Sequence, residues 1–185
     1  MIGKSEITGI HLHISGGVAA TLMPWWVQWL RTNSDSLIIN CSISAGALRF
    51  VTEEGLRSLC NGSVWSDSWD SPDLPGSWMD GESPGATGFL VAPASLNTVM
   101  KLSAGETSTP AMMMLQMTKR PIVLADTIPG GNEIIEENIE RLSRRHNVHW
   151  APRVEGFRAV DRSAKMTGFN IPGAFDMLSN FIKGL

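Results

Sequence analysis

The sequence has no tyrosine, two cysteines and four histidines among 185 residues, and its charges nearly balance at a net −3. So small a charge gives no electrostatic reason to bind nucleic acid or a membrane surface. Cys41 and Cys60 have no metal-ligand spacing, and two cysteines suit a reducing compartment better than a disulfide scaffold. No apolar run is long enough to span a bilayer, and the N-terminus lacks the layout of a signal peptide. These absences favour a soluble protein of the cytoplasm.

What the sequence does contain is a series of short apolar runs that alternate with helical patterns, over a length that fits one domain, residues 1–185. Strands are expected at 9–14, 36–41, 89–92, 120–125 and 148–151, and helices at 18–31, 42–51, 52–60, 111–117, 133–145 and from 172. Two segments without clear periodicity, 61–87 and 152–170, are expected to be loops. Five or six strands in this alternation predict a doubly wound, Rossmann-like parallel α/β sheet with helices on both faces and ligand-binding loops at the strand ends.

The turn after the first strand, Ser15-Gly16-Gly17, is a candidate anion site. A helix N-terminus that follows such a turn points free N–H groups and its dipole at the turn. Tight strand-to-helix turns also need glycine for purely structural reasons, so the pattern alone leaves both interpretations open. Ser44, after the second strand, is likewise either a helix cap or a phosphate ligand, and one hydroxyl can serve both purposes.

Residues 89–98 form the stretch around which the chain is organised. Four apolar residues predict a buried strand, and Pro93 is expected to end it because proline cannot donate to a β-ladder. Small or polar residues and one leucine follow: Ala94, Ser95, Leu96, Asn97 and Thr98. A buried strand that leads through polar side chains into a helix is typical of a ligand site, although Ser95 or Asn97 is also a competent N-cap.

His11 and His13 alternate onto one face of the first strand. A metal pair is conceivable there, but no third ligand lies nearby in the sequence. Satisfied or solvated histidines are far more common, so no metal site is predicted.

Pro93-Ala-Ser-Leu-Asn-Thr98 resembles the Pro-Ala-Ser-Ala-Asn-Thr signature of the homo-oligomeric flavin-containing cysteine decarboxylases. Pro129 and Asn132 keep the spacing of the second signature, Pro-x-Met-Asn, although Gly131 replaces its methionine. The resemblance covers roughly residues 9–150. It implies a flavoprotein that binds FMN between the subunits of a trimer, which often assembles into a dodecamer.

The resemblance also implies roles for individual residues. Ser15, Gly16, Gly17 and Ser44 would hold the FMN phosphate, and Pro93, Ala94, Ser95, Leu96, Asn97 and Thr98 would hold the isoalloxazine. Asn132 would bind the substrate carboxylate, and it is also a competent N-cap for the helix after it. The late loop at 152–170 would clamp the substrate with its cations Arg153, Arg158, Arg162 and Lys165.

One family feature is missing. Decarboxylating members carry a histidine about fourteen residues before the Pro-Ala-Ser signature, where this chain has Met79 followed by Asp80, and no histidine lies between His13 and His146. Either Asp80 supplies the polar group or the flavin drives thiol oxidation without a base there. A non-catalytic, FMN-binding regulatory protein is the alternative that this absence favours.

Two branches of the family fit poorly. The phosphopantothenoylcysteine branch uses a cysteine in the late loop, and this chain has none after Cys60; the flavin prenyltransferase branch needs tyrosine, which is absent. The remaining branch oxidatively decarboxylates the C-terminal cysteine of a precursor peptide to an aminoenethiol during the maturation of peptide antibiotics. We therefore expect an FMN-dependent peptidyl-cysteine decarboxylase, with a phosphopantothenoylcysteine decarboxylase-like enzyme kept as an alternative.

Overall fold

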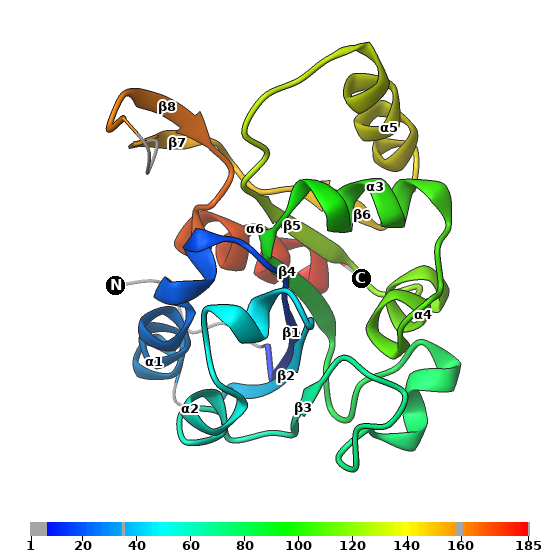
Figure 1. The fold of residues 1–185 in the computed structure, drawn as a ribbon. Coiled ribbons are helices and arrows are strands. Elements are labelled where there is room, and N and C mark those ends of the chain that lie inside the picture. The colour runs from blue at the N-terminus through cyan, green and yellow to red at the C-terminus, as the bar shows by residue number, and fades with distance from the viewer. Residues whose placement is uncertain (1–6, 35, 158–160, 185) are drawn as a thin grey trace.

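A six-stranded sheet with the order β3-β2-β1-β4-β5-β6 lies at the centre of the computed structural model, which describes residues 7–34, 36–157 and 161–184 (Figure 1). Each pair of neighbouring strands in it is parallel. The strands are β1 Gly9–Ile14, β2 Ile38–Ile43, β3 Val64–Ser66, β4 Gly88–Ala94, β5 Ile122–Asp126 and β6 Val148–Trp150. The helices are α1 Met23–Asn33, α2 Glu53–Arg57, α3 Leu96–Ala104, α4 Pro110–Met117, α5 Glu133–Ser143 and α6 Ile171–Lys183, with shorter 3-10 helices η1 Val18–Leu22, η2 Ala47–Arg49 and η3 Gly76–Asp80.

The order of the strands reverses between β1 and β4. From β1 the chain adds β2 and then β3 on one side, and from β4 it adds β5 and then β6 on the other. The loops after β1 and β4 therefore leave in opposite directions and open a crevice at the carboxyl ends of these strands. The predicted doubly wound parallel sheet is confirmed.

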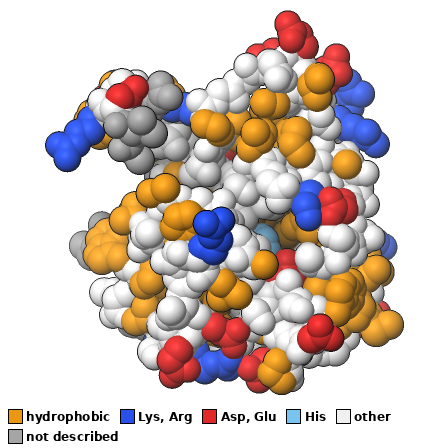
Figure 2. All heavy atoms as spheres, viewed as in Figure 1, with side chains coloured by type: hydrophobic (Ala, Val, Ile, Leu, Met, Phe, Trp, Pro, Cys, Tyr) orange, Lys and Arg blue, Asp and Glu red, His pale blue; other side chains and the backbone are white. Residues whose placement is uncertain are grey.

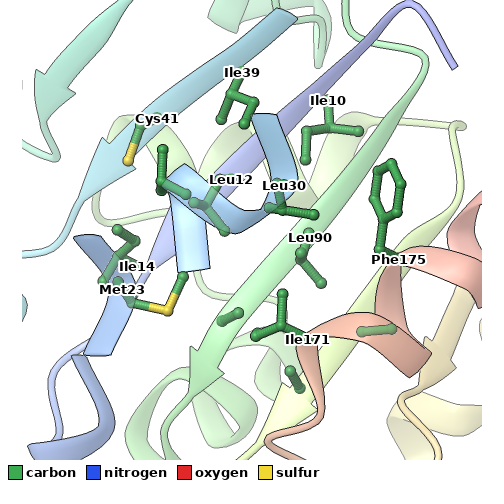
Figure 3. Packing of buried hydrophobic residues seen from close by; sticks show 14 of the residues in the cluster. Ile10, Leu12, Ile14, Met23, Leu30, Ile39, Cys41, Leu90, Ile171 and Phe175 are labelled. Carbon is green, nitrogen blue, oxygen red and sulfur yellow. The ribbon is translucent and has the colours of Figure 1, made fainter. Parts of the chain in front are cut away.

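Apolar side chains cover both faces of the sheet. On one face Ile10, Leu12 and Ile14 of β1 pack with α1 and α6, to which Leu30 and Phe175 belong (Figure 3). On the other face a second cluster joins alternate residues of β4 and β5 to α3, α4 and α5. Strands buried on both faces need nearly continuous apolar sequence, which is the pattern that predicted them.

Helices begin where the sequence supplies a cap. The side chains of Thr52, Ser95, Thr109, Asn132 and Asn170 each accept a hydrogen bond from the backbone N–H three residues later. Such a bond satisfies a donor that the helix itself leaves unpaired. Ser95 and Asn132 are thus confirmed as N-caps.

Several predicted boundaries are wrong. The helix expected at 18–31 is divided into η1 and α1. Strand β2 continues to Ile43 because its last residues pair with both β1 and β3, so only η2 remains of the helix expected at 42–51. Pro93 was expected to end its strand but lies inside β4, after a cis peptide bond. The pairing of β4 with β5 is irregular at this point, so the missing N–H of proline interrupts no regular hydrogen-bond ladder.

The two segments expected to be loops contain strands. Residues 61–87 include β3, which extends the sheet, and η3. Residues 152–170 include an antiparallel hairpin of β7 Val154–Phe157 and β8 Ala164–Thr167. Their periodicity is weak because these strands are only three or four residues long. Arg158 lies outside the described residues.

Candidate cofactor and substrate site

A pocket of about 470 Å³ opens at the carboxyl ends of β1, β2 and β4. Six of the residues predicted to hold a cofactor line it: Gly16, Gly17, Ser44, Ser95, Asn97 and Thr98. In space-filling view a histidine side chain is visible at the bottom of a hollow on this side of the molecule (Figure 2). Sequence positions up to 82 residues apart thus meet at the crevice where a doubly wound sheet binds its ligands.

Two glycines bring the loops after β1 and β2 into backbone contact. A Cβ on Gly16 would lie 2.8 Å from the carbonyl carbon of Gly46 and 2.9 Å from its Cα. Backbone atoms cannot move aside as a side chain can, so a larger residue at position 16 would force the two loops apart. A Cβ on Gly17 meets nothing within 4 Å, because this residue faces the open pocket.

Ser15 fastens the ends of β1 and β4 to each other. Its hydroxyl donates to the carbonyl of Pro93 at 2.6 Å and accepts from the N–H of Ser95 at 2.8 Å. Ser15, Pro93 and Ala94 are buried and do not line the pocket, and Leu96 packs against the core beside it. These four residues lie behind the residues that line the pocket, and their contact with a cofactor stays a prediction.

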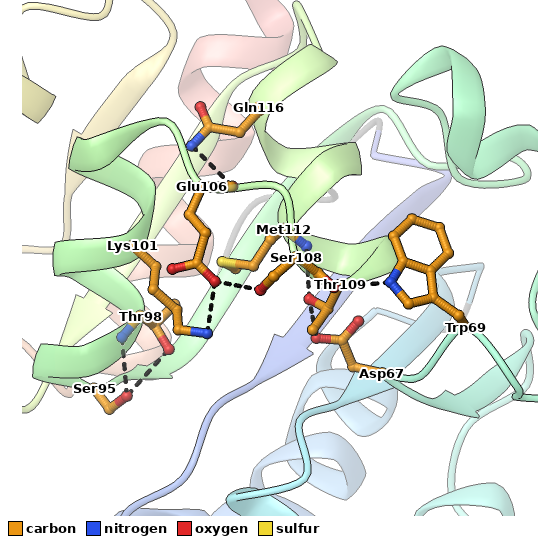
Figure 4. Close-up of polar contacts among 10 residues, drawn as sticks. All are labelled: Asp67, Trp69, Ser95, Thr98, Lys101, Glu106, Ser108, Thr109, Met112 and Gln116. Atoms are coloured by element: carbon orange, nitrogen blue, oxygen red, sulfur yellow. Dashed lines mark hydrogen bonds and ion pairs between the residues drawn. The ribbon is translucent and has the colours of Figure 1, made fainter.

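The N-terminus of α3 faces the pocket. Ser95 accepts from the N–H of Thr98 at 3.4 Å, and the two hydroxyl oxygens are 3.1 Å apart (Figure 4). One turn later Lys101 forms an ion pair of 2.9 Å with Glu106 at the rim. Arg49, on the other rim, is exposed. Free N–H groups, hydroxyls and a cation in one concave site are the donors that a phosphate group requires.

Asp67 and His13 form the floor and the wall toward α4. The Asp67 carboxylate accepts from the hydroxyl of Thr109 at 2.7 Å (Figure 4). It also accepts from the N–H of Ala111 at 2.8 Å, and the two bonds fix the start of α4. His13 Nδ1 lies 2.8 Å from Ser42 Oγ. Burial lowers the pKa of His13, and the nearby Asp67 carboxylate opposes that shift.

The chain is similar to known proteins over nearly its whole length. The family model described as "Flavoprotein" matches residues 3–170. The chain belongs to the flavoprotein family.

This flavoprotein is 48% identical to a Streptomyces sp protein named cypemycin cysteine dehydrogenase (decarboxylating), over 94% of this chain and 91% of that one. The crystal structure of the cypemycin decarboxylase CypD superposes with a TM-score of 0.89 at 43% identity, covering 100% of this chain and 98% of that one. An FMN-dependent cysteine decarboxylase from thioviridamide biosynthesis, TvaF, has a TM-score of 0.65 at 21% identity, covering 77% and 88% respectively, and shows likeness of fold.

The two residues predicted to act on the substrate lie outside this pocket of the flavoprotein. Asn132 caps α5, after the carboxyl end of β5, with its side-chain oxygen 3.0 Å from the N–H of Ile135. Asp80 is exposed at the end of η3. Neither residue lines the described pocket, so both roles stay predictions.

The β7–β8 hairpin stands over the carboxyl end of β5. Arg153 forms an ion pair of 3.2 Å with Asp126, whose carboxylate is almost fully buried at the end of that strand. Lys165 donates to the carbonyl of Ile128, and Asn170 donates to the carbonyl of Pro152 at 3.1 Å. Two of the predicted clamp cations, Arg153 and Lys165, thus hold the hairpin to the sheet.

Several residues in this flavoprotein were not predicted from the sequence: His13, Asp67, Arg49 and Lys101 line the pocket, and Asp126 anchors the hairpin. A signal for Asp126 exists, because an acidic residue directly after a buried apolar strand lies at the ligand-binding edge. Asp67 follows a strand that the sequence does not reveal.

Among the described residues no group of three or more His, Cys, Asp or Glu is placed to hold a metal ion. Within that same part of the chain, no helix is both long and apolar enough to cross a membrane.

Proposed function

We propose that this flavoprotein binds FMN and oxidatively decarboxylates the C-terminal cysteine of a precursor peptide, leaving an aminoenethiol. The observation that carries this function is the 48% identity, over 94% of the chain, to a protein named as a decarboxylating cysteine dehydrogenase. The protein is an enzyme of the peptidyl-cysteine decarboxylase type. The pocket at the β1–β4 crevice is where its chemistry would take place.

The residues of the pocket fit FMN. Gly17 leaves open space, the N–H groups of Leu96 and Asn97 at the start of α3 have no partner among the described residues, and Ser44 and Ser95 add hydroxyls to the pocket. The exposed guanidinium of Arg49 supplies positive charge for a phosphate. Bound FMN supplies the two-electron oxidation of the cysteine side chain.

The chain itself binds and orients the peptide. We propose that the side-chain amide of Asn132 donates to the terminal carboxylate, which fixes the bond that breaks as carbon dioxide leaves. The hairpin would cover the peptide and limit the access of water. Positioning of this kind contributes much of the rate in enzymes whose cofactor carries the chemistry.

The decisive experiment is mass spectrometry of cysteine-ending peptides after incubation with the purified protein, whose visible absorbance is recorded beforehand. We expect a yellow protein and a loss of about 46 Da, which corresponds to carbon dioxide and two hydrogens. A yellow protein that changes no peptide would contradict the decarboxylase and leave the regulatory alternative. A colourless protein that also leaves peptides unchanged after FMN is added would contradict FMN binding.

Asp80 is proposed to act on a peptide bound to a second copy of the chain. Its carboxylate is exposed on η3 and away from the pocket of its own subunit, so a contribution within one subunit has no support in the geometry. We expect Asp80→Asn to lower turnover by at least about tenfold, the smaller end of general-base effects. Asp70→Asn, at another exposed acid of the same segment, is the matched control. Equal turnover for the two variants would remove Asp80 from the mechanism.

A homo-oligomer, such as a trimer or a dodecamer, is proposed from an apolar surface beside the pocket. Val18, Leu22 and Trp25 are 60%, 52% and 61% exposed on η1 and α1, and Leu48 and Phe50 are exposed in and just after η2. Helix η1 begins just after Gly16 and η2 just after Gly46, and these two glycines are in backbone contact, so the exposed residues lie near each other. Exposed apolar patches of this kind are typical of subunit interfaces.

We expect Trp25→Glu to shift the protein toward smaller species in sedimentation velocity, because a charge would be buried at the interface. Ile134→Glu is the control, since Ile134 is 67% exposed on α5. A wild-type protein that sediments as a monomer, or a Trp25→Glu variant with unchanged mass, would contradict the interface.

A cytoplasmic location is proposed as well. Cys41 and Cys60 are free thiols, which a reducing compartment preserves. Recovery of the protein in a secreted fraction of its host would contradict this location.

A further inference from the structure

A chain of four polar side chains runs through the interior between the site pocket and a second pocket. Ser83 Oγ lies 2.9 Å from His11 Nδ1, His11 Nε2 lies 2.8 Å from Ser42 Oγ, and Ser42 Oγ lies 2.8 Å from His13 Nδ1. None of the four residues is more than 3% exposed. The contacts are therefore continuous and shielded from solvent.

The two ends of this chain reach different surfaces. His13 lines the pocket at the carboxyl ends of the strands, and its Nε2 has no hydrogen-bond partner among the described residues. Ser83 lines a pocket of about 410 Å³ formed by residues that precede β4 and β5, including Thr87 and Arg120. Ser77 Oγ, in that second pocket, is buried with no partner in the part of the chain that the structure describes, which is a suitable place for an ordered water.

Packing of the core alone does not explain why histidines occupy positions 11 and 13. Positions 11 and 13 lie on a central strand, and the ring of His11 has the rings of Trp65 and Phe89 as neighbours, with centroids 5.9 and 5.5 Å away. Apolar side chains would suit such surroundings, whereas buried polar groups cost free energy that only complete hydrogen bonding offsets.

Both imidazole rings are neutral at neutral pH. Burial, together with the neighbouring His13, lowers the pKa of His11 to about 3. Burial likewise lowers the pKa of His13, against the opposing effect of Asp67. Each ring therefore carries one N–H, and the single hydroxyl proton of Ser42 decides which ring donates to Ser42 and which accepts from it.

We propose that Ser83, His11, Ser42 and His13 form a proton relay between the site pocket and solvent in the second pocket. A proton that reaches His13 Nε2 releases the proton on Nδ1 to Ser42. Ser42 passes its own proton to His11 Nε2, and His11 Nδ1 passes its proton to Ser83, which gives one to water. One proton enters and one leaves, every hydrogen bond reverses, and all four groups end neutral.

The relay rests on the proposed decarboxylase function for its use. Oxidation of the cysteine to a thioaldehyde requires the thiol proton to leave, and the enethiolate that remains after loss of carbon dioxide takes up a proton. A peptide covered by the hairpin exchanges such protons slowly with bulk water. The relay supplies a path for these protons that does not require the hairpin to move away from the peptide.

The first test breaks the relay without touching the site pocket. His11→Phe keeps an aromatic ring among Trp65 and Phe89 and leaves the Ser42–His13 contact in place. We expect turnover to fall on the order of tenfold, at the low end of proton-transfer effects, with an altered solvent deuterium isotope effect and unchanged FMN affinity. Phe89→Leu is the control, because it changes the packing around His11 but keeps every relay group. A wild-type rate and isotope effect in His11→Phe would overturn the relay.

The second test needs neither cofactor nor substrate. In cofactor-free protein we expect Ser83→Ala to shift the ¹⁵N resonances of the His13 ring, three hydrogen bonds away, because the loss of one end changes the tautomers along the chain. Ser83→Thr keeps the hydroxyl and should restore the wild-type spectrum. Unchanged His13 resonances in Ser83→Ala would overturn the coupling, and they would do so even if the protein proved to have another activity.

Discussion

Asn132→Asp should lose decarboxylation of a cysteine-ending peptide by on the order of 100-fold while keeping FMN affinity and the stability of α5. An aspartate accepts the same hydrogen bond from Ile135 N–H as the asparagine does, so the helix cap survives. It has no amide N–H to donate to the peptide carboxylate, and it places a second negative charge beside it. Like charges in contact cost several kcal/mol, and each 1.4 kcal/mol is about tenfold in rate.

Two variants at the same position separate catalysis from folding. Asn132→Ala loses both the cap and the carboxylate contact, so it should be inactive and less stable by about 1 kcal/mol. Asn132→Ser keeps a capping hydroxyl and should lose turnover without that loss of stability. The measurements are single-turnover rates by mass spectrometry, FMN titration and thermal unfolding. Wild-type turnover in Asn132→Asp would remove Asn132 from carboxylate binding.

Gly16→Ala should weaken FMN binding by about 10- to 100-fold and leave the fold intact. The added methyl group would lie 2.8 to 3.0 Å from three backbone atoms of Gly46, so the loops after β1 and β2 must separate. Overpacking of this size costs about 1–3 kcal/mol, and the displaced loops carry residues on both sides of the pocket.

Gly76→Ala is the matched control for that variant. It adds the same methyl group at a glycine where nothing lies within 4 Å of the new atom. Fluorescence titration with FMN measures both affinities, and far-ultraviolet circular dichroism checks the fold. Equal affinity for the two variants would show that the contact between Gly16 and Gly46 does not shape the cofactor site.

Local signals in the sequence were sufficient for much of the fold. The run at 89–98 predicted a buried strand followed by a helix, and Ser95 caps that helix as expected. These elements follow from side-chain periodicity and caps, which act over a few residues. Strand β3 and the hairpin do not follow from such local signals, because their three- or four-residue strands form only by pairing with a neighbouring strand.

The chemistry of the site was predictable only in part. The glycines and hydroxyls of the crevice lie directly after strands, so the topology brings them together. His13 and Asp67 are 54 positions apart in the sequence. They line the same pocket because His13 is on β1, Asp67 directly follows β3, and only β2 separates these two strands in the sheet. The family spacing before Pro93 indicates Asp80, but this residue ends η3 and does not line the pocket. Spacing along an irregular segment does not determine distance in space.

The hairpin between Pro152 and Asn170 has consequences for redesigning the enzyme. Its two ends are hydrogen-bonded to each other, and it is attached to Asp126, the last residue of β5, and to Ile128 just after that strand. The pocket, in contrast, lies at the ends of β1, β2 and β4. The segment is therefore an exchangeable module: we expect a graft of the corresponding hairpin of a relative at these two points to change the proposed peptide cover and to leave the residues of the pocket in place. On the proposed roles, such grafts should change the range of accepted peptides and leave FMN affinity unchanged.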